Sequence, residues 1–232
     1  MTPLILLPGL LCDAALWAPQ RAAGADVADC HVPDLTRDDT MAAMARRVLD
    51  EAPFERFALA GFSMGGYCAL ELMRQAPERV TRLALLDTSP HTDTPERREE
   101  RLRFIELAQG DGFVPITRVM VPFLVHPDRV NDEPLVRVVR EMGVHVGAAA
   151  YVRQQRAIMS RVDSVPLLGA IHCPTLVLCG AQDTRTVPAD HDTMAREIRG
   201  ARQVSIPDCG HMAPLERPEA VSAALRDWLT WN

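Results

Sequence analysis

The chain has 232 residues, of which 47% are hydrophobic and 24% are charged, and its formal net charge is -6. These values are ordinary for a globular protein and exclude the disordered and fibrous classes. The length suffices for one sizeable α/β core with an insertion. All 25 cationic side chains are arginine, so Schiff-base chemistry and a general base on lysine are excluded. The acidic balance gives no electrostatic reason to expect nucleic acid or an anionic membrane as a partner.

The sequence contains no apolar run that approaches the roughly 20 residues needed to cross a bilayer. Its apolar start, residues 1–11, lacks the basic region of a signal peptide and is broken by Pro8-Gly9. We therefore expect a cytoplasmic protein without a membrane partner. The six cysteines lack Cys-x-x-Cys spacing, which argues against a zinc site and a disulfide framework. We expect no metal and no cofactor.

Short apolar runs alternate with segments of helical period over the first ninety residues. Strands are expected at 4–7, 27–32, 57–60 and 83–86, and helices at 14–22, 40–51 and 67–73. Asp39 or Thr40 is the candidate cap of the second helix. This alternation favours a parallel sheet covered by helices on both faces, with ligands bound beyond the carboxyl ends of the strands.

The alternation stops between residues 91 and 162, where no strand pattern is evident. Helices are expected at 95–109, 133–144 and 147–161, around a Gly- and Pro-punctuated stretch at 110–127. It then resumes with strands at 175–179 and 203–206 and helices at 189–198 and 218–231. We therefore predict a core domain formed by 1–90 and 163–232, with 91–162 as an inserted helical lid that covers the site. A plain connecting helical subdomain is the alternative.

A glycine-flanked serine follows the third predicted strand, in Gly61-Phe62-Ser63-Met64-Gly65. The pattern Gly-x-Ser-x-Gly between a strand and a helix is typical of a nucleophile elbow, in which the serine occupies a strained turn and the glycines allow a close approach. Such a short motif also arises by chance, and a serine at a helix start is commonly only a cap.

A serine hydroxyl becomes a useful nucleophile when a histidine base lies within hydrogen-bond reach and a carboxylate orients that base. In an open sheet the chain order is serine, acid, histidine. Asp183 follows the strand at 175–179 and His211 follows the strand at 203–206. Because parallel strands end at the same sheet edge, we expect Ser63, Asp183 and His211 to meet there. Asp87, at the end of the fourth strand, is a rival acid, and Asp183 is preferred for its place after the penultimate strand.

The other histidines lack such a context and are interpreted as surface or lid residues: His31, His91, His126, His145, His172 and His191. Asp13, just beyond the first loop, and Gln155 and Arg161, on the last predicted lid helix, are candidate substrate contacts. For these three, the interpretation as solvated polar residues is preferred over substrate contact.

Five runs of the sequence together resemble the α/β-hydrolase fold, in the small esterase, lactonase and carboxylesterase-like group. The matching runs are Leu7-Pro8-Gly9-Leu10, Gly61 to Gly66, Leu86 to Ser89, Pro174 to Asp183, and Gly210 to Glu219. The resemblance implies Ser63 as nucleophile, His211 as base and then acid, and Asp183 as the orienting acid. It further implies an oxyanion hole formed by the backbone N–H groups of Leu10 and Met64.

The sequence departs from the family pattern in two places. Pro8 stands where the family often has histidine, which bears on the position of the oxyanion loop. The family also usually has an antiparallel hairpin before the strand found here at 4–7. We therefore expect a mostly parallel open sheet of about six strands, without that hairpin.

The predicted function is that of a cofactor-free serine hydrolase, which cleaves a small carboxylic ester, thioester or lactone through an acyl-enzyme. A serine at position 63 disfavours dehalogenase and epoxide hydrolase chemistry, which needs a carboxylate nucleophile on the same fold. A carbon–carbon bond hydrolase, an enol-lactonase or a cofactor-free perhydrolase remain alternatives with the same triad. A ligand-binding, receptor-like protein with slow or no turnover is the alternative of another class.

Overall fold

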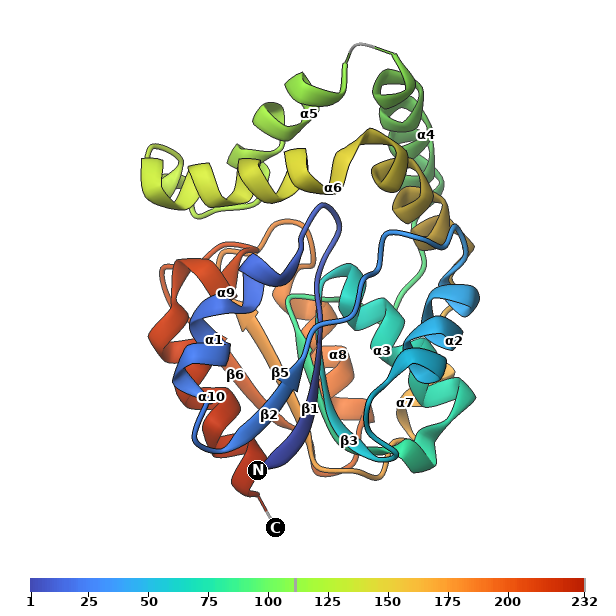
Figure 1. Cartoon of the computed structure of the whole chain (residues 1–232), viewed down its shortest axis with the longest axis vertical. Helices are drawn as coiled ribbons and strands as arrows, with labels where there is room; N and C mark the ends of the chain where they lie inside the picture. The colour runs from blue at the N-terminus through green and yellow to red at the C-terminus, as the bar shows by residue number, and fades with distance from the viewer. Residues whose placement is uncertain (111, 232) are drawn as a thin grey trace.

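Six strands form one sheet at the centre of the protein, in the spatial order β2-β1-β3-β4-β5-β6 (Figure 1). The computed structural model describes residues 1–110 and 112–231, and of Pro115 the backbone alone. Every neighbouring pair of strands in the described chain is parallel. This confirms the predicted parallel open sheet of about six strands. The strands are β1 (Thr2–Leu7), β2 (Ala28–His31), β3 (Phe57–Phe62), β4 (Val80–Leu86), β5 (Thr175–Gly180) and β6 (Arg202–Ile206).

The central strands are apolar because both faces of the sheet are covered. All six residues of β3 and of β5 are buried, as expected for a parallel sheet between two helical layers. Successive side chains of a strand point to opposite faces. Along β1, Leu4 and Leu6 therefore pack in one hydrophobic cluster, whereas Ile5 and Leu7 pack in the other.

Helices cover the two faces of the sheet in separate groups (Figure 1). One face is covered by η1 (Ala14–Trp17), α1 (Ala18–Ala23), α9 (Ala213–Glu216) and α10 (Pro218–Thr230), and the other by α2 (Met41–Glu51), α3 (Met64–Gln75), α7 (Val165–Leu168) and α8 (Pro188–Glu197). A short η2 (Pro77–Arg79) leads into β4. Of the two candidate caps of α2, Thr40 is the one used, because its side chain accepts a hydrogen bond from Ala43 N.

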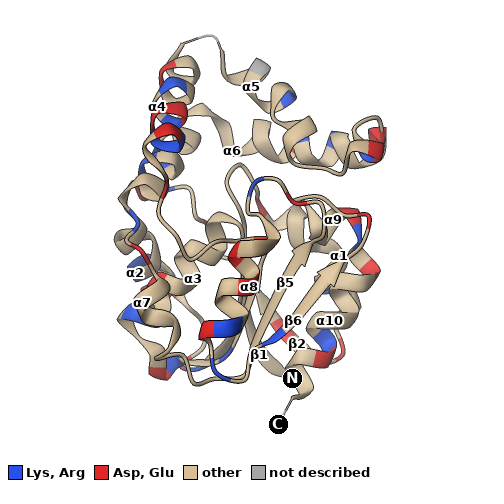
Figure 2. Cartoon of the chain, turned by 180° about the vertical axis from the view of Figure 1, so that it is seen from behind, with Lys and Arg blue, Asp and Glu red and all other residues tan. Residues whose placement is uncertain are grey.

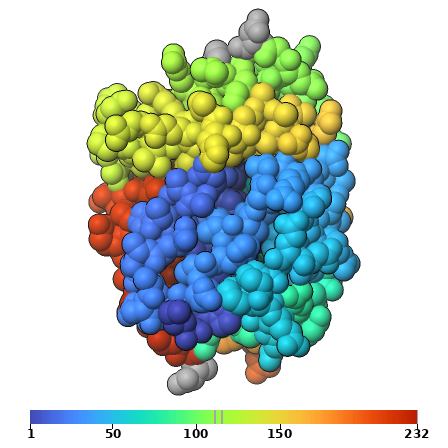
Figure 3. Space-filling model, in the orientation of Figure 1, coloured from blue at the N-terminus to red at the C-terminus, as the bar shows by residue number. Residues whose placement is uncertain are grey.

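Between β4 and β5 the chain forms a helical layer that lies across one end of the sheet (Figures 1 and 3). Its elements are α4 (Pro95–Gln109), α5 (Phe113–Val119), η3 (Val121–Phe123), η4 (Pro127–Arg129) and α6 (Glu133–Ser160). Figure 2 shows that α4 carries many charged residues of both signs. We call this layer, residues 95–160, the helical insertion. None of the helices in the described ranges is long and apolar enough to cross a membrane.

The helical insertion differs from the sequence-based prediction in its middle and agrees with it in its last part. The stretch 110–127, predicted from its Gly and Pro content to be punctuated loop, contains α5 and η3. The two helices expected at 133–144 and 147–161 are confirmed, because α6 consists of two helical parts that meet at a kink, where Gly147 has non-helical backbone angles (φ 79°, ψ 164°). Asp111 and Asn232, which the predicted lid and core ranges include, lie outside the described residues.

Candidate active site

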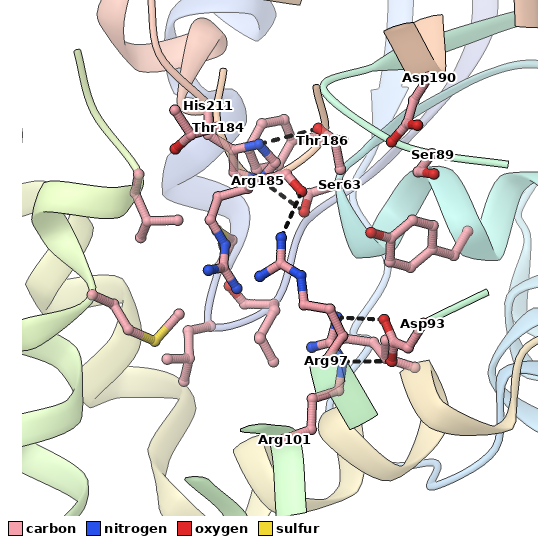
Figure 4. Close-up of a pocket in the computed structure, with 18 of the residues that line it drawn as sticks. Ser63, Ser89, Asp93, Arg97, Arg101, Thr184, Arg185, Thr186, Asp190 and His211 are labelled. Carbon is pink, nitrogen blue, oxygen red and sulfur yellow. Dashed lines mark hydrogen bonds and ion pairs between the residues drawn. The ribbon is translucent and has the colours of Figure 1, made fainter. Parts of the chain in front are cut away.

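Ser63, His211 and Asp183 lie together at the carboxyl edge of the sheet, although they are far apart in the sequence. His211 Nε2 is 2.9 Å from Ser63 Oγ, and His211 Nδ1 is 2.8 Å from Asp183 Oδ2. Figure 4 shows His211 between Thr186 and Ser63. The side chains of His211 and Asp183 are buried. Hydroxyl, imidazole and carboxylate therefore form one continuous chain of hydrogen bonds.

Ser63 occupies a strained turn between β3 and α3. Its backbone is in the left-handed region, with φ 52° and ψ -115°, which is costly for a residue with a side chain. A Cβ on Gly61 would collide with the backbone of Gly65, and a Cβ on Gly65 would collide with the Leu7 carbonyl. The Ser63 hydroxyl makes no capping bond to α3. The turn therefore presents the hydroxyl to His211 and not to the helix.

Asp183 is fixed by hydrogen bonds to both carboxylate oxygens. Oδ1 accepts from the backbone N–H groups of Arg185 (2.7 Å) and Thr186 (3.1 Å), and Oδ2 accepts from Thr186 Oγ1 (2.6 Å) as well as bonding to His211. Burial raises the pKa of this carboxyl, but the charge of His211 and the hydrogen bonds outweigh burial and hold the pKa below its usual value. Asp183 therefore stays ionised and orients Nδ1–H of His211.

Asp87, the rival acid, is buried at the end of the neighbouring strand β4. In the described chain its carboxylate forms no hydrogen bond with a histidine. Its Oδ1 accepts from Gly180 N at 2.8 Å, and its Oδ2 has no hydrogen-bond partner in the described chain. Burial, with the nearby charge of Asp183, raises the pKa of Asp87 well above its usual value. The structure therefore pairs His211 with Asp183 and not with Asp87.

The backbone N–H groups of Leu10 and Met64 lie in the first loop and at the first position of α3. Neither donates to another group of the described chain. The neighbouring Leu11 N, in contrast, donates to Gln154 Oε1 at 3.1 Å. Gln154 is fully buried on α6 and also donates to Leu35 O. The helical insertion thus holds the first loop, a contact that the sequence pattern did not reveal.

A cavity of about 380 Å³ opens at Ser63, between the sheet edge and the helical insertion. Ser63, His211, Phe62 and Leu10 form its floor, and apolar side chains of the insertion, including Met120, Leu124, Val139 and Ile158, form much of its wall. Four arginines also line it: Arg97, Arg101, Arg161 and Arg185 (Figure 4 labels three of them). The volume suits a small organic ligand.

The three candidate substrate contacts lie in different surroundings. Arg161 lines the cavity, but its guanidinium donates to Asp93 Oδ1 (2.9 Å) and to the carbonyls of His91 and Ile158. Gln155 lies behind the cavity wall, where Oε1 accepts from Arg101 (2.8 Å). Asp13 starts η1 and contacts His145 Nδ1 at 2.6 Å, away from the cavity lining.

The interpretation of His191 as a surface or lid residue is wrong. His191 is fully buried on α8, in the core. Its Nε2 accepts from Thr88 N (3.0 Å), so the neutral ring carries its proton on Nδ1, which faces Val187 O. Burial lowers the pKa of this imidazole and keeps it neutral. His91 is exposed, as predicted, and also lines the cavity. Among the described residues, no three His, Cys, Asp or Glu side chains are grouped as metal ligands.

Comparisons with known proteins agree with this architecture. A model of the alpha/beta hydrolase family matches residues 4–224. A thermophilic esterase from Thermogutta terrifontis, solved with malate bound, has 33% sequence identity and a TM-score of 0.92, over 99% of this chain and 89% of its own. The enol-lactonase from Burkholderia xenovorans LB400 has 27% identity and a TM-score of 0.87, over 100% of this chain and 92% of its own.

A carbon–carbon bond hydrolase is also among the relatives. The 2-hydroxy-6-oxo-6-phenylhexa-2,4-dienoate hydrolase of Comamonas testosteroni is 28% identical over 214 residues, which are 89% of this chain and 74% of that protein. The match of the family model spans nearly the whole fold. The chain therefore belongs to the alpha/beta hydrolase family and is an enzyme of that family.

Proposed function

We propose that this hydrolase cleaves a small carboxylic ester, thioester or lactone through an acyl-enzyme on Ser63. The observation that carries the proposal is the hydrogen-bond chain from Asp183 through His211 to Ser63, which ends at the cavity. Ser63 attacks the carbonyl carbon of the substrate while His211 Nε2 takes the hydroxyl proton. Asp183 stabilises the imidazolium that forms.

The second half of the reaction uses the same three groups in reverse. The imidazolium of His211 gives its proton to the leaving alcohol, thiol or ring oxygen, which leaves an acyl ester on Ser63. Water then enters, His211 takes its proton, and attack on the acyl ester releases the acid and restores the Ser63 hydroxyl. The substrate is the only partner that this cycle requires.

We assign the oxyanion hole to the N–H groups of Leu10 and Met64. Both lack an acceptor in the described chain, and a backbone donor needs no particular side chain, so Pro8 in place of a histidine is compatible with the role. A donor of this kind contributes about 3–4 kcal/mol to the transition state. The helical insertion roofs the cavity and acts as the predicted lid, which keeps bulk water from the acyl-enzyme.

The relatives support ester and lactone substrates first. The Thermogutta terrifontis protein is named an esterase and the Burkholderia xenovorans protein an enol-lactonase. The carbon–carbon bond hydrolase of Comamonas testosteroni is less similar in sequence to this chain than the esterase is. Hydrolysis of a carbon–carbon bond on the same triad is therefore the second candidate function.

A fluorophosphonate probe combined with p-nitrophenyl esters of increasing acyl length tests the proposal. We expect the probe to label the wild-type protein, and Ser63→Ala to abolish labelling and to lower kcat by about 10⁴-fold or more. Ser205→Ala, at an exposed serine on β6, is the matched control and should label normally. Labelling that survives Ser63→Ala would refute the assignment, and labelling without turnover of any ester, thioester or lactone would favour the receptor-like alternative.

A further inference from the structure

The cavity carries more positive charge than its own acidic residues balance. Four arginines line it, against two aspartates, Asp93 and Asp190. Asp93 is fully occupied: it pairs with Arg101 (2.7 Å) and with Arg161 (2.9 Å). Asp190 forms no ion pair with an arginine among the described residues and lies 4.0 Å from His91 Nε2. The remaining two arginines, Arg97 and Arg185, therefore have no acidic partner on the cavity wall.

The guanidinium of Arg185 makes no hydrogen bond and no ion pair within the described chain, although Arg185 is half-buried. Arg97 has one weak ion pair, at 3.4 Å to a partly exposed Glu100. Its Nη2 also donates to the backbone carbonyl of Arg185 at 3.1 Å. This bond brings α4 and the loop after β5 together at the cavity.

Figure 4 shows the consequence for the two side chains. Arg97 reaches from α4, and Arg185 from the loop after β5, into the same part of the cavity as Ser63 and His211, whereas Arg101 lies beside Asp93. Burial, and then the charge of Arg97, lower the pKa of the Arg185 guanidinium. An arginine nonetheless stays protonated in a protein. Two cations held this close repel each other, and an anion between them removes that cost.

We propose that the preferred substrates of this enzyme carry a free carboxylate on the acyl group, which Arg185 and Arg97 bind while Ser63 attacks the ester or lactone carbonyl. A guanidinium offers two parallel N–H donors that match the two oxygens of a carboxylate. The neutral, apolar part of the wall then receives the methylene chain between the two carbonyl carbons. This inference rests on the proposed function, because it names the substrate class of the same site.

The direct test compares matched pairs of esters on the purified enzyme. The p-nitrophenyl monoesters of adipic and pimelic acid carry the carboxylate, and the corresponding ω-carboxamide esters are neutral and of the same size. We expect the wild-type enzyme to prefer the charged member in kcat/KM by at least about 10-fold, and Arg185→Gln to lower this preference by about 10- to 100-fold. Arg97→Gln should lower it less, in the same direction.

The matched control is Arg103→Gln, which removes the same charge from α4 at a side chain that is 71% exposed and paired with Glu99. This variant should keep the preference for the charged ester. A wild-type enzyme without such a preference, or a preference equal in Arg185→Gln, Arg97→Gln and Arg103→Gln, overturns the proposal.

A binding measurement separates this proposal from the catalytic one. We expect adipate to bind Ser63→Ala in calorimetry more tightly than adipamide does, and added salt to reduce the difference. If no ester is hydrolysed but adipate binds selectively, the proposed reaction fails and the anion site stands. If neutral esters are hydrolysed and adipate does not bind, the anion site fails and the proposed reaction stands. These hydrolysis and binding measurements also test the anion site if Arg185→Gln fails to fold, because they do not use that variant.

Discussion

Two buried carboxyl groups at neighbouring strand ends have pKa values shifted in opposite directions, that of Asp87 upward and that of Asp183 downward. Asp183 receives two backbone N–H donors, a hydroxyl and an imidazole, which are enough to keep it ionised despite burial. Asp87 receives one backbone N–H, and its second oxygen has no partner in the described chain. The number of donors, and not the depth of burial, therefore distinguishes Asp183 from Asp87 as the acid of the proposed triad.

Because the pKa of Asp87 is raised in the folded state, Asp87 lowers the free energy of unfolding by an amount that depends on pH. Because its folded pKa lies well above the unfolded value of 3.8, the folded state holds a proton that the unfolded state loses. Unfolding stability thus falls as pH rises above about 4, by about 1.4 kcal/mol per pH unit until Asp87 ionises. We expect Asp87→Asn to be more stable relative to wild type at pH 8 than at pH 5, as measured by urea unfolding at both values.

Asp208→Asn is the control for this prediction. Asp208 lies in the turn after β6 and also has a left-handed backbone, at φ 50° compared with φ 43° for Asp87, but Asp208 is exposed. The control variant should show the same stability relative to wild type at both pH values. An equal effect of Asp87→Asn at pH 5 and pH 8 would contradict the prediction.

The proximity of the three proposed catalytic residues was predictable at this scale because they follow strand ends in a fixed order. Ser63, Asp183 and His211 come together wherever parallel strands share an edge. Arg185, Gln154 and His191 had no such signal. Their roles depend on which way each side chain points between packed elements, and residue spacing along the chain does not determine that direction.

At the scale of elements, the helical insertion and the histidine loop are joined by one buried carboxylate. Glu216, on α9, accepts from His126 N (2.7 Å) with Oε2 and from Met212 N (3.1 Å) with Oε1. Met212 N also donates to Leu124 O at 3.0 Å. The loop that carries His211 is therefore held from the insertion side as well as from the sheet.

We expect Glu216→Gln to impair catalysis through the position of His211. The amide NH₂ group of the new glutamine faces the backbone N–H of either His126 or Met212, which then lacks its acceptor. The loss lowers the free energy of unfolding by about 1–3 kcal/mol. It also loosens the histidine loop, so kcat should fall by about 10-fold while KM changes little. Steady-state kinetics on a p-nitrophenyl ester and thermal unfolding check both effects.

Glu219→Gln, at an exposed glutamate in the first turn of α10, serves as the comparison and should leave both quantities unchanged. A rise in KM with constant kcat in Glu216→Gln would show that Glu216 does not position His211.

Elements were predictable where a pattern was uniform. The apolar strands of the sheet and α4 agree with their predicted ranges to within a few residues. The helix α5 was not predicted, because the Gly and Pro residues near its start were interpreted as helix-breaking residues. A proline in the first turn of a helix, however, removes no backbone hydrogen bond. The break between the two parts of α6 was predictable, because a glycine stands where the helical pattern is interrupted.

For the whole molecule, the bend in α6 joins the roof of the cavity to the core. The first part of α6 crosses the end of the sheet and the last part turns down beside α4 (Figure 1). At the bend, Gly147 has φ 79°, and a Cβ there would meet nothing within 4 Å. The cost of a side chain at this position is therefore one of backbone conformation alone.

Gly147→Ala and Gly169→Ala form a matched pair that tests this view. Gly169 also has open space around its Cβ position, but its φ is -66°. We expect Gly147→Ala to lose about 1–2 kcal/mol of unfolding stability, which lowers Tm by about 2–4 °C per kcal/mol in a chain of this size. Gly169→Ala should gain about 0.4–1 kcal/mol. Equal Tm values for the two variants would exclude backbone strain as the cause.

In the turn from Asp183 to Thr186, the main chain and the side chain of one residue have different roles. Its backbone N–H at position 185 helps to orient the triad acid, while the side chain at the same position faces the cavity. Any residue other than proline supplies that N–H, so position 185 is free to vary without disturbing the catalytic groups. If Arg185 binds an anionic acyl group as proposed, a single codon change at this position alters the charge that the cavity offers to the substrate and leaves the backbone contact to Asp183 in place, so this turn is a suitable position for the divergence or redesign of specificity.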